Sequence, residues 1–184
     1  MNVSDAIRSR KSVRAYLDKQ VLPDDVARIV EAGQWAPNAG AFQISVIRDA
    51  ELRKKINDQT SDAMLKSDIE FLQQRASLPG YQPLYGAPVF ILLSAPTTAP
   101  YSAFNVAAAA ENMLLEATAL GLASCFLLSP TFALRRDENR ALLQEAGVPE
   151  GYAPQCAVIV GYAAAENKFT LGERSKKGTV NYID

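Results

Sequence analysis

The chain has 184 residues, of which 48% are hydrophobic and 21% are charged, so it can bury one ordinary core and is predicted to be a single domain over 1–184. Its formal net charge of −1 provides no positive field that would attract nucleic acid or anionic lipid, and we expect neither a nucleic-acid nor a membrane partner. The absence of histidine and the presence of only two cysteines exclude Ser-His-Asp catalysis, Cys-His nucleophiles and the usual zinc sites, so no metal is expected.

The amino-terminal residues and the cysteines both indicate a cytoplasmic protein. Residues 1–20 carry several charges and no apolar stretch, so neither a signal peptide nor a transmembrane span is predicted there. Cys125 and Cys156 lie in apolar segments, where buried, reduced cysteine is the usual state in a cytosolic chain. The glycines form neither the G-x-G-x-x-G pattern nor a P-loop. An enzyme with this sequence would therefore depend on another kind of bound cofactor.

Capping residues, turn residues and apolar periodicity divide the first half of the chain into short elements. Ser4 and Asp49 are predicted helix caps, and Gly33 and Pro37 are predicted to stop the second helix. In chain order we expect helices over about 4–10 and 23–32, a strand over 43–48, a helix after Asp49 that includes residues 52 and 56, an amphipathic helix over 61–78 and a central strand over 88–93.

The second half is dominated by an apolar helix over about 105–120. It contains four consecutive alanines and only two charged residues, so it is predicted to be buried nearly all round, as the central pillar of the core, as part of a subunit interface, or as both. A strand over 123–128, a helix over about 134–146 and a strand over 156–160 follow. The segment after residue 160 is too apolar for a free tail. Long helices around few strands favour the α+β fold class.

The densest chemical feature is the segment Arg8–Arg14, which holds four cations and two hydroxyl groups. Guanidinium groups form paired, charge-assisted hydrogen bonds to phosphate, and a serine hydroxyl adds a compact donor beside them. The alternative interpretation is that these cations complement the negative end of a short helix and stay solvated. The residues by themselves leave both interpretations open.

Two further segments present polar groups. Pro37 and Gly40 shape a tight loop over 36–43 that leaves the amides of Asn38 and Gln43 available for the edge of a heteroaromatic ring, although an ordinary turn would use the same residues. Near the end of the chain Arg174 stands with two lysines, a group that would by itself be interpreted as a solvated tail.

Taken in this order, these features resemble the nitroreductase-like family of FMN-dependent oxidoreductases. Residues 7–16 resemble its opening signature, 36–43 its Ala-Pro-Ser loop and 112–122 its central helix, while Gly161-Tyr162 precedes its late arginine. The resemblance implies an α+β, nitroreductase-like three-layer fold with a central, mostly antiparallel sheet flanked by helices. It also implies a domain-exchanged homodimer with FMN at the interface, in which the C-terminal segment of about 163–184 wraps onto the partner subunit.

The resemblance further implies which residues hold FMN. In relatives the basic motif binds the cofactor and the late arginine binds its phosphate. The loop lies beside the flavin ring, and backbone groups near Leu128 face its N5 edge. A cation such as Arg14 near N1 would stabilise negative charge on the reduced flavin. The implied cofactor-binding residues are Arg10, Lys11, Ser12, Arg14, Pro37, Asn38, Gln43, Leu128, Ser129 and Arg174.

The chain departs from the family pattern beside the ring, because Asn38 replaces the usual serine, Ala41 stands where asparagine is frequent and Ile44-Ser45 replaces a frequent Pro-Trp. We expect these differences to affect the choice of acceptor more than the binding of FMN, since the residues implied to bind the phosphate lie elsewhere in the chain. The aromatic residues predicted to face the substrate are Phe42, Tyr81, Tyr85, Tyr101 and Phe104, with core packing as the alternative for Phe104.

The implied mechanism is ping-pong, with NADH or NADPH as the electron donor and a small planar acceptor such as a nitroaromatic or a quinone. The flavin carries the chemistry, so no catalytic side chain is predicted, which agrees with the absence of histidine. Two alternatives stay open: a specialised flavin relative that performs ene reduction, reductive dehalogenation or flavin degradation, and an FMN-binding storage or sensing module with little turnover. A phosphate-ligand binding protein without flavin is a third.

Overall fold

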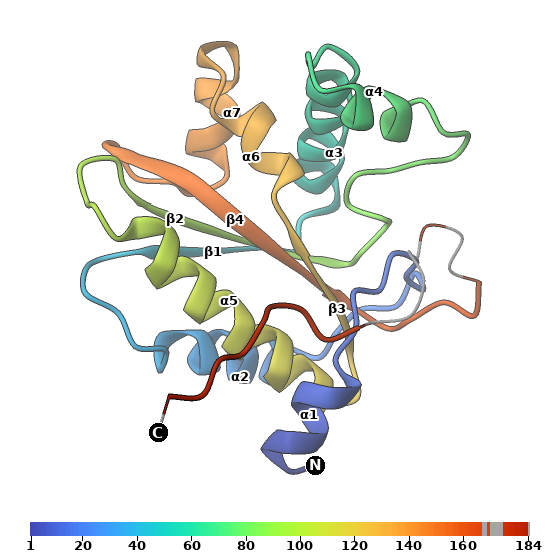
Figure 1. The fold of residues 1–184 in the computed structure, drawn as a ribbon. Helices are drawn as coiled ribbons and strands as arrows, with labels where there is room; N and C mark the ends of the chain where they lie inside the picture. The colour runs from blue at the N-terminus through green and yellow to red at the C-terminus, as the bar shows by residue number, and fades with distance from the viewer. Residues whose placement is uncertain (167–168, 170–174, 184) are drawn as a thin grey trace.

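The computed structural model describes residues 1–166, 169 and 175–183 and shows an α+β fold of three layers (Figure 1). The middle layer is a four-stranded sheet in the order β1-β2-β4-β3 in which every pair of neighbouring strands is antiparallel. The strands are β1 (Gln43–Ile47), β2 (Val89–Pro96), β3 (Ala123–Leu127) and β4 (Tyr152–Gly161). Helices α1, α2 and α5 lie on one face, and α3, α4, α6 and α7 lie on the other. The predicted fold class and antiparallel sheet are confirmed.

β2 and β4 occupy the centre of the sheet because their side chains are buried on both faces. Ile91 and Leu93 of β2 point into the core cluster on the α2–α5 side, whereas Phe90 and Leu92 point into the cluster on the α3–α6 side. This period of two is the geometry of a strand. The prediction of a central strand covered on both faces is confirmed.

α2 (Pro23–Gln34) and α5 (Ser102–Ala119) pack against each other on one face of the sheet. The prediction that Gly33 stops α2 is wrong, because Gly33 lies within the helix. A Cβ atom at this position would collide with the side chain of Met113 in α5. The glycine therefore permits close approach of two helices instead of ending one of them.

Within one chain α5 is buried on one side only, so the core alone does not surround it, and the predicted burial of its other side in a subunit interface stays a prediction. Ala109 and Met113 on its inner side are fully buried, whereas Phe104 is 74% exposed and Ala107 and Glu111 are also exposed. Core packing of Phe104, the alternative considered from the sequence, is excluded by this exposure.

α3 (Ala50–Leu65) begins where predicted, because the Asp49 carboxylate accepts a hydrogen bond from the Leu52 amide at 2.7 Å. The single helix predicted over 61–78 is wrong, since residues 61–65 complete α3 and α4 (Glu70–Ala76) begins separately. Between them the Ser67 hydroxyl accepts from the Ile69 amide at 3.1 Å, so a side-chain hydrogen bond replaces part of the helical ladder.

The single helix predicted over 134–146 is also wrong. α6 (Ser129–Leu134) ends where that helix was predicted to begin, and a 3₁₀ turn (Asp137–Asn139) and α7 (Arg140–Glu145) follow. The buried Asn139 side chain donates to the Ala133 carbonyl at 3.0 Å. A continuous helix would use that carbonyl for its own backbone ladder. At the other end of the chain, α1 (Val3–Ser9) is capped by Asn2 and not by the predicted Ser4.

The C-terminal residues 175–183 are all exposed. Val180, Tyr182 and Ile183 are 74%, 85% and 90% exposed, respectively, so this apolar segment is not packed against its own chain. That it wraps onto a partner subunit stays a prediction. No helix among the described residues combines the length and the apolarity needed to cross a bilayer.

Candidate functional site

The basic segment lies along the outer edge of β3. After α1 the chain is fixed there by a main-chain hydrogen bond of 3.0 Å to the Ser124 carbonyl and by a parallel bridge between Ser12 and Ser124. Alternate residues of an extended segment point to the same side. Arg10, Ser12 and Arg14, which are all partly buried, therefore lie together, whereas Lys11 is exposed.

The buried Cys125 of β3 marks the place where these side chains converge. Burial raises the pKa of its thiol, and the opposing influences are the charge of Arg14, a hydrogen bond from Ser12 and the charge of Arg10. A protonated, buried thiol is not a nucleophile. The alternation of residues 10, 12 and 14 in the extended segment beside β3 places two guanidinium groups and one hydroxyl on one side of it, which is a donor set suited to phosphate.

Arg10 is held in place by α5. Its Nε atom lies 3.3 Å from Oε1 of Glu111, and its side chain is only 15% exposed. The long side chain therefore loses most of its rotational freedom before any ligand binds, which lowers the entropy cost of binding.

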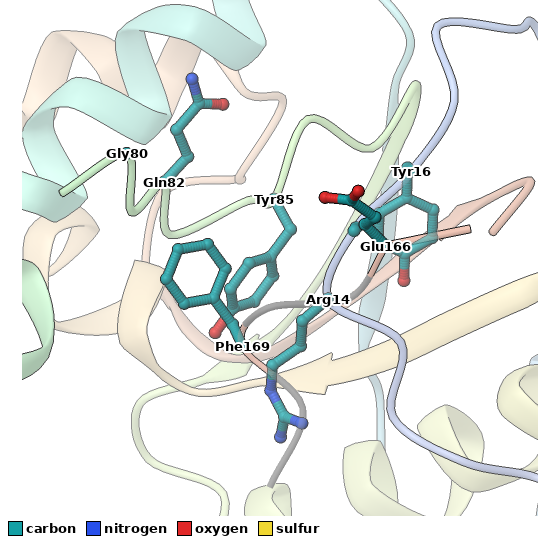
Figure 2. A pocket seen from close by; sticks show the side chains of 8 residues that line it. Arg14, Tyr16, Gly80, Gln82, Tyr85, Glu166 and Phe169 are labelled. Carbon is teal, nitrogen blue, oxygen red and sulfur yellow. The ribbon is translucent and has the colours of Figure 1, made fainter. Parts of the chain in front are cut away.

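A cavity of 220 Å³ opens beside Arg14 (Figure 2). Tyr16 forms part of its wall, and the Tyr16 hydroxyl donates to the Val13 carbonyl at 2.9 Å. Burial raises the pKa of Tyr16 well above its usual range, so this phenol stays neutral. The residues that line the cavity are Arg14, Ala15, Tyr16, Gly80, Gln82, Tyr85, Glu166 and Phe169.

Two of the tyrosines predicted to face the substrate meet at this cavity. Tyr85 lines it, and Tyr81 packs edge-on against Tyr85 with 5.6 Å between the ring centroids. Phe169 completes the group at 5.5 Å from Tyr81 and 6.2 Å from Tyr85. Figure 2 shows the rings of Tyr85 and Phe169 side by side near the Arg14 side chain. The cavity therefore combines a cation with an aromatic wall whose rings are tilted or edge-on to one another.

The loop over 36–43 borders a different hollow, of 520 Å³. Asn105 at the start of α5 anchors the loop, because its Oδ1 atom accepts from the Ala39 amide at 3.0 Å. Asn38, Phe42 and Gln43 line this hollow. Pro37 is exposed at the start of the same loop.

The loop and the basic segment lie at opposite corners of the sheet. Gln43 pairs with Ser94 at one edge, whereas Ser124 pairs with Val160, which in turn pairs with Val89. Three strand spacings and five residues along a strand separate the two corners by roughly 20 Å. One chain therefore does not bring the predicted cofactor-binding residues into a single pocket.

The sequence model of the Nitroreductase family matches residues 7–162, which is most of the chain. The chain belongs to the nitroreductase family. A provisionally named NADH dehydrogenase/NAD(P)H nitroreductase of Archaeoglobus fulgidus is 29% identical over 171 residues, covering 89% of this chain and 86% of the relative. A solved nitroreductase of Bacteroides fragilis with bound FMN is 32% identical, with a TM-score of 0.88 and 100% of both chains covered.

A second solved nitroreductase with bound FMN, from Desulfitobacterium hafniense, has a TM-score of 0.89 at 23% identity and covers 100% of both chains. At this identity the likeness shows the fold alone. The likeness to both solved structures extends over the whole chain, including the basic segment and the residues of the aromatic cavity.

Two further pairs of predicted residues lie away from the cavity. Leu128 and Ser129 form the corner between β3 and α6, where the Leu128 carbonyl accepts from both the amide and the hydroxyl of Thr131, at 3.0 and 2.8 Å. Tyr101 and Phe104 lie at the exposed start of α5 and do not line the Arg14 cavity. Arg174 lies outside the described residues.

Most of the residues that line the cavity were not predicted as site residues from the sequence, since only Arg14 and Tyr85 of the lining were. Gln82 and Phe169 line the cavity, and Arg75 of α4 lies behind Tyr85. Arg75 and Phe169 stand in segments whose pattern indicates only an amphipathic helix and an apolar tail. No local signal points to their meeting, because 94 residues separate the two.

Proposed function

We propose that this member of the nitroreductase family is an FMN-dependent oxidoreductase that takes a hydride from NADH or NADPH and passes it to a small planar acceptor, such as a nitroaromatic or a quinone, in a ping-pong reaction. The observation that carries this proposal is the alignment of Arg10, Ser12 and Arg14 along β3, ending at a cavity with an aromatic wall. The bound FMN of the Bacteroides fragilis relative, at 32% identity over its whole length, supports it.

The residues along β3 fit the chemistry of FMN. Arg10 and Ser12 offer charge-assisted donors that suit its phosphate and ribityl chain. Arg14, at the mouth of the cavity, would face the pyrimidine end of the ring and offset negative charge there. Bound FMN supplies the redox chemistry itself, as an acceptor and then a donor of hydride.

Tyr16, Tyr81 and Cys125, which stand around the cavity, are not suited to acid–base catalysis near neutral pH. Burial raises the pKa of Tyr16, of Cys125 and, together with a hydrogen bond to Tyr85, of Tyr81. These groups hold their protons and serve as walls and hydrogen-bond partners. Protons for the reduced acceptor would come from solvent, which agrees with a chain that contains no histidine.

We infer that the working form is a homodimer with shared flavin sites. The cavity of 220 Å³ is smaller than the roughly 300 to 1,000 Å³ typical of ligand pockets, and the loop that would lie beside the ring is at the far corner of the sheet. A second copy could place its loop against the basic segment of the first. The exposed apolar tail, the outer side of α5 and Trp35, which is 79% exposed, all offer surface for such an interface.

The visible spectrum of the purified protein tests the proposal. We expect a bound flavin whose band near roughly 450 nm bleaches on anaerobic addition of NADH or NADPH and returns when a nitroaromatic or a quinone is added. Bound FMN that neither nicotinamide reduces would contradict the oxidoreductase and favour a storage or sensing module. Sedimentation of the FMN-loaded protein tests the homodimer, and a flavin-loaded monomer would refute it.

A further inference from the structure

Arg75 of α4 connects three parts of the aromatic cavity. Its Nη2 atom donates to the Tyr85 hydroxyl at 3.1 Å and to the Phe169 carbonyl at 3.3 Å. Its guanidinium group also lies over the Tyr81 ring, 5.2 Å from the centroid. α4 has no fully buried residue, and its partly buried Arg75 reaches the cavity wall through these contacts.

All of these partners are neutral. Among residues 1–166, 169 and 175–183, no carboxylate forms an ion pair with the guanidinium group of Arg75 or of Arg14. Burial disfavours the charged form of Arg75, but hydrogen bonds to Tyr85 and Tyr81 outweigh burial and raise its pKa. Two positive charges therefore stand on either side of the cavity wall without a described ion pair, and Glu166 is the carboxylate among the described residues that line the cavity.

Tyr85 is held in a conformation that costs free energy. Its φ is +52°, and it is the one non-glycine residue with positive φ in the described part of the chain. Such a conformation persists only where the surroundings enforce it. Here the enforcing contacts are the hydrogen bond from Arg75, the edge-on Tyr81 ring and a backbone hydrogen bond to Gln82 at 2.9 Å. The Arg75 contact therefore helps to aim the Tyr85 ring into the cavity.

The field of Arg75 also reaches the strand that carries the basic segment. Arg75 is among the cations that oppose the effect of burial on the Cys125 thiol, together with Arg14 and Arg10. A ligand placed between Arg14 and Tyr85 would therefore experience both guanidinium groups, one directly and the other across the phenol ring.

We propose that Arg75 is a positioning residue of the flavin pocket that acts through Tyr85. It holds the phenol wall opposite Arg14 and adds a second positive charge behind that wall, so that the reduced, more negative flavin is bound more tightly than the oxidised one. This inference rests on the proposed binding of FMN beside Arg14. Arg75 itself touches no reacting atom in this arrangement.

The test is the midpoint potential of FMN bound to Arg75→Gln, measured by photoreduction against a reference dye, together with the dissociation constant of oxidised FMN. We expect the preference for reduced over oxidised FMN to fall about tenfold, which equals a potential about 30 mV lower for a two-electron couple. Arg75→Lys keeps the charge and should recover most of this shift. Arg140→Gln removes an exposed cation of α7 and serves as the charge-matched control with an unchanged potential.

Equal potentials for the wild type and Arg75→Gln, or equal shifts for the Gln and Lys variants, would overturn the proposal. If Arg75→Gln does not fold, the midpoint potential of FMN bound to Tyr85→Phe tests the proposal instead, because this substitution removes only the oxygen that accepts a hydrogen bond from Arg75. It should lower the potential in the same direction by a smaller amount, and an unchanged potential would overturn the proposal.

Photoreduction separates this inference from the proposed function. A wild-type protein whose FMN is reduced by light but by neither NADH nor NADPH would refute the oxidoreductase, while the comparison of potentials would still decide the role of Arg75. A wild-type protein that binds no FMN would refute both.

Discussion

Replacing Gly161 by alanine should lower the unfolding free energy of the protein and also weaken its binding of FMN. A Cβ atom at this last residue of β4 would lie 2.6 Å from Cδ and 3.0 Å from Cγ of Pro88, and 2.8 Å from Cδ1 of Tyr16. The proline ring is rigid, and the buried Tyr16 ring is held by its hydrogen bond to the Val13 carbonyl. Neither neighbour is the free end of a flexible side chain, so backbone must shift.

The expected cost lies in the upper half of the range for overpacking, about 2 to 3 kcal/mol of unfolding free energy. For a chain of 184 residues this corresponds to a Tm lower by roughly 4 to 12 °C. Thermal unfolding of the FMN-free protein is the suitable assay, since bound ligand would mask part of the difference. Because Tyr16 lines the cavity, the dissociation constant of FMN should rise as well.

Gly40→Ala provides the matched control for stability. Its added Cβ would meet only Nδ2 of Asn105, at 3.6 Å, which is ordinary van der Waals contact. Its unfolding free energy should stay within about 0.5 kcal/mol of the wild type. A Gly161→Ala protein that melts within about 2 °C of the wild type would refute the argument from close packing.

Three further results are expected. Arg14→Ala should lower the midpoint potential of bound FMN more than Arg75→Gln does, because Arg14 lines the cavity directly; an unchanged potential would remove this role from Arg14. Deletion of residues 175–184 should convert the dimer to a monomer with weaker FMN binding, and a dimer that survives the deletion in sedimentation would show that the tail is dispensable. Burial raises the pKa of Cys156 to about 12, against about 8.5 in an unfolded chain. The folded state therefore keeps the Cys156 proton at pH values where the unfolded state has lost it. The contribution of this thiol to the unfolding free energy is complete below about pH 8.5 and declines as the pH rises towards about 12. Between about pH 9 and 10.5 the unfolding free energy in urea should fall by about 1.4 kcal/mol per pH unit more for the wild type than for Cys156→Ala, and parallel profiles would contradict the assignment.

Local chemistry accounts for the predictions that the structure confirms. The run over 88–93 is apolar at every position, so a strand there has to be covered on both faces, as β2 is. Asp49 caps α3 because its side chain reaches an amide only three residues away. Such features depend on neighbours along the chain, and they hold wherever the segment is placed.

The incorrect helix boundaries share a different cause. Ser67 and Asn139 replace backbone hydrogen bonds with side-chain hydrogen bonds, and Ile69 and Phe71 of the predicted amphipathic stripe are 52% and 60% exposed. An apolar stripe on a helix is buried only if another element packs against it. No described element covers Ile69 and Phe71 at the start of α4. Gly33 illustrates the same point, because its role depends on Met113 of another helix.

The sequence by itself determined the fold class, the family resemblance and the identity of the basic segment, since these depend on residue types and their spacing along the chain. Only the tertiary structure decided where those residues stand. The order β1-β2-β4-β3 puts the loop before β1 and the segment beside β3 at opposite corners, and the packing of α4 brings Arg75 to Tyr85 and Phe169. The physical reason is that contacts between distant segments follow from strand order and helix packing, which no local period of two or 3.6 residues encodes.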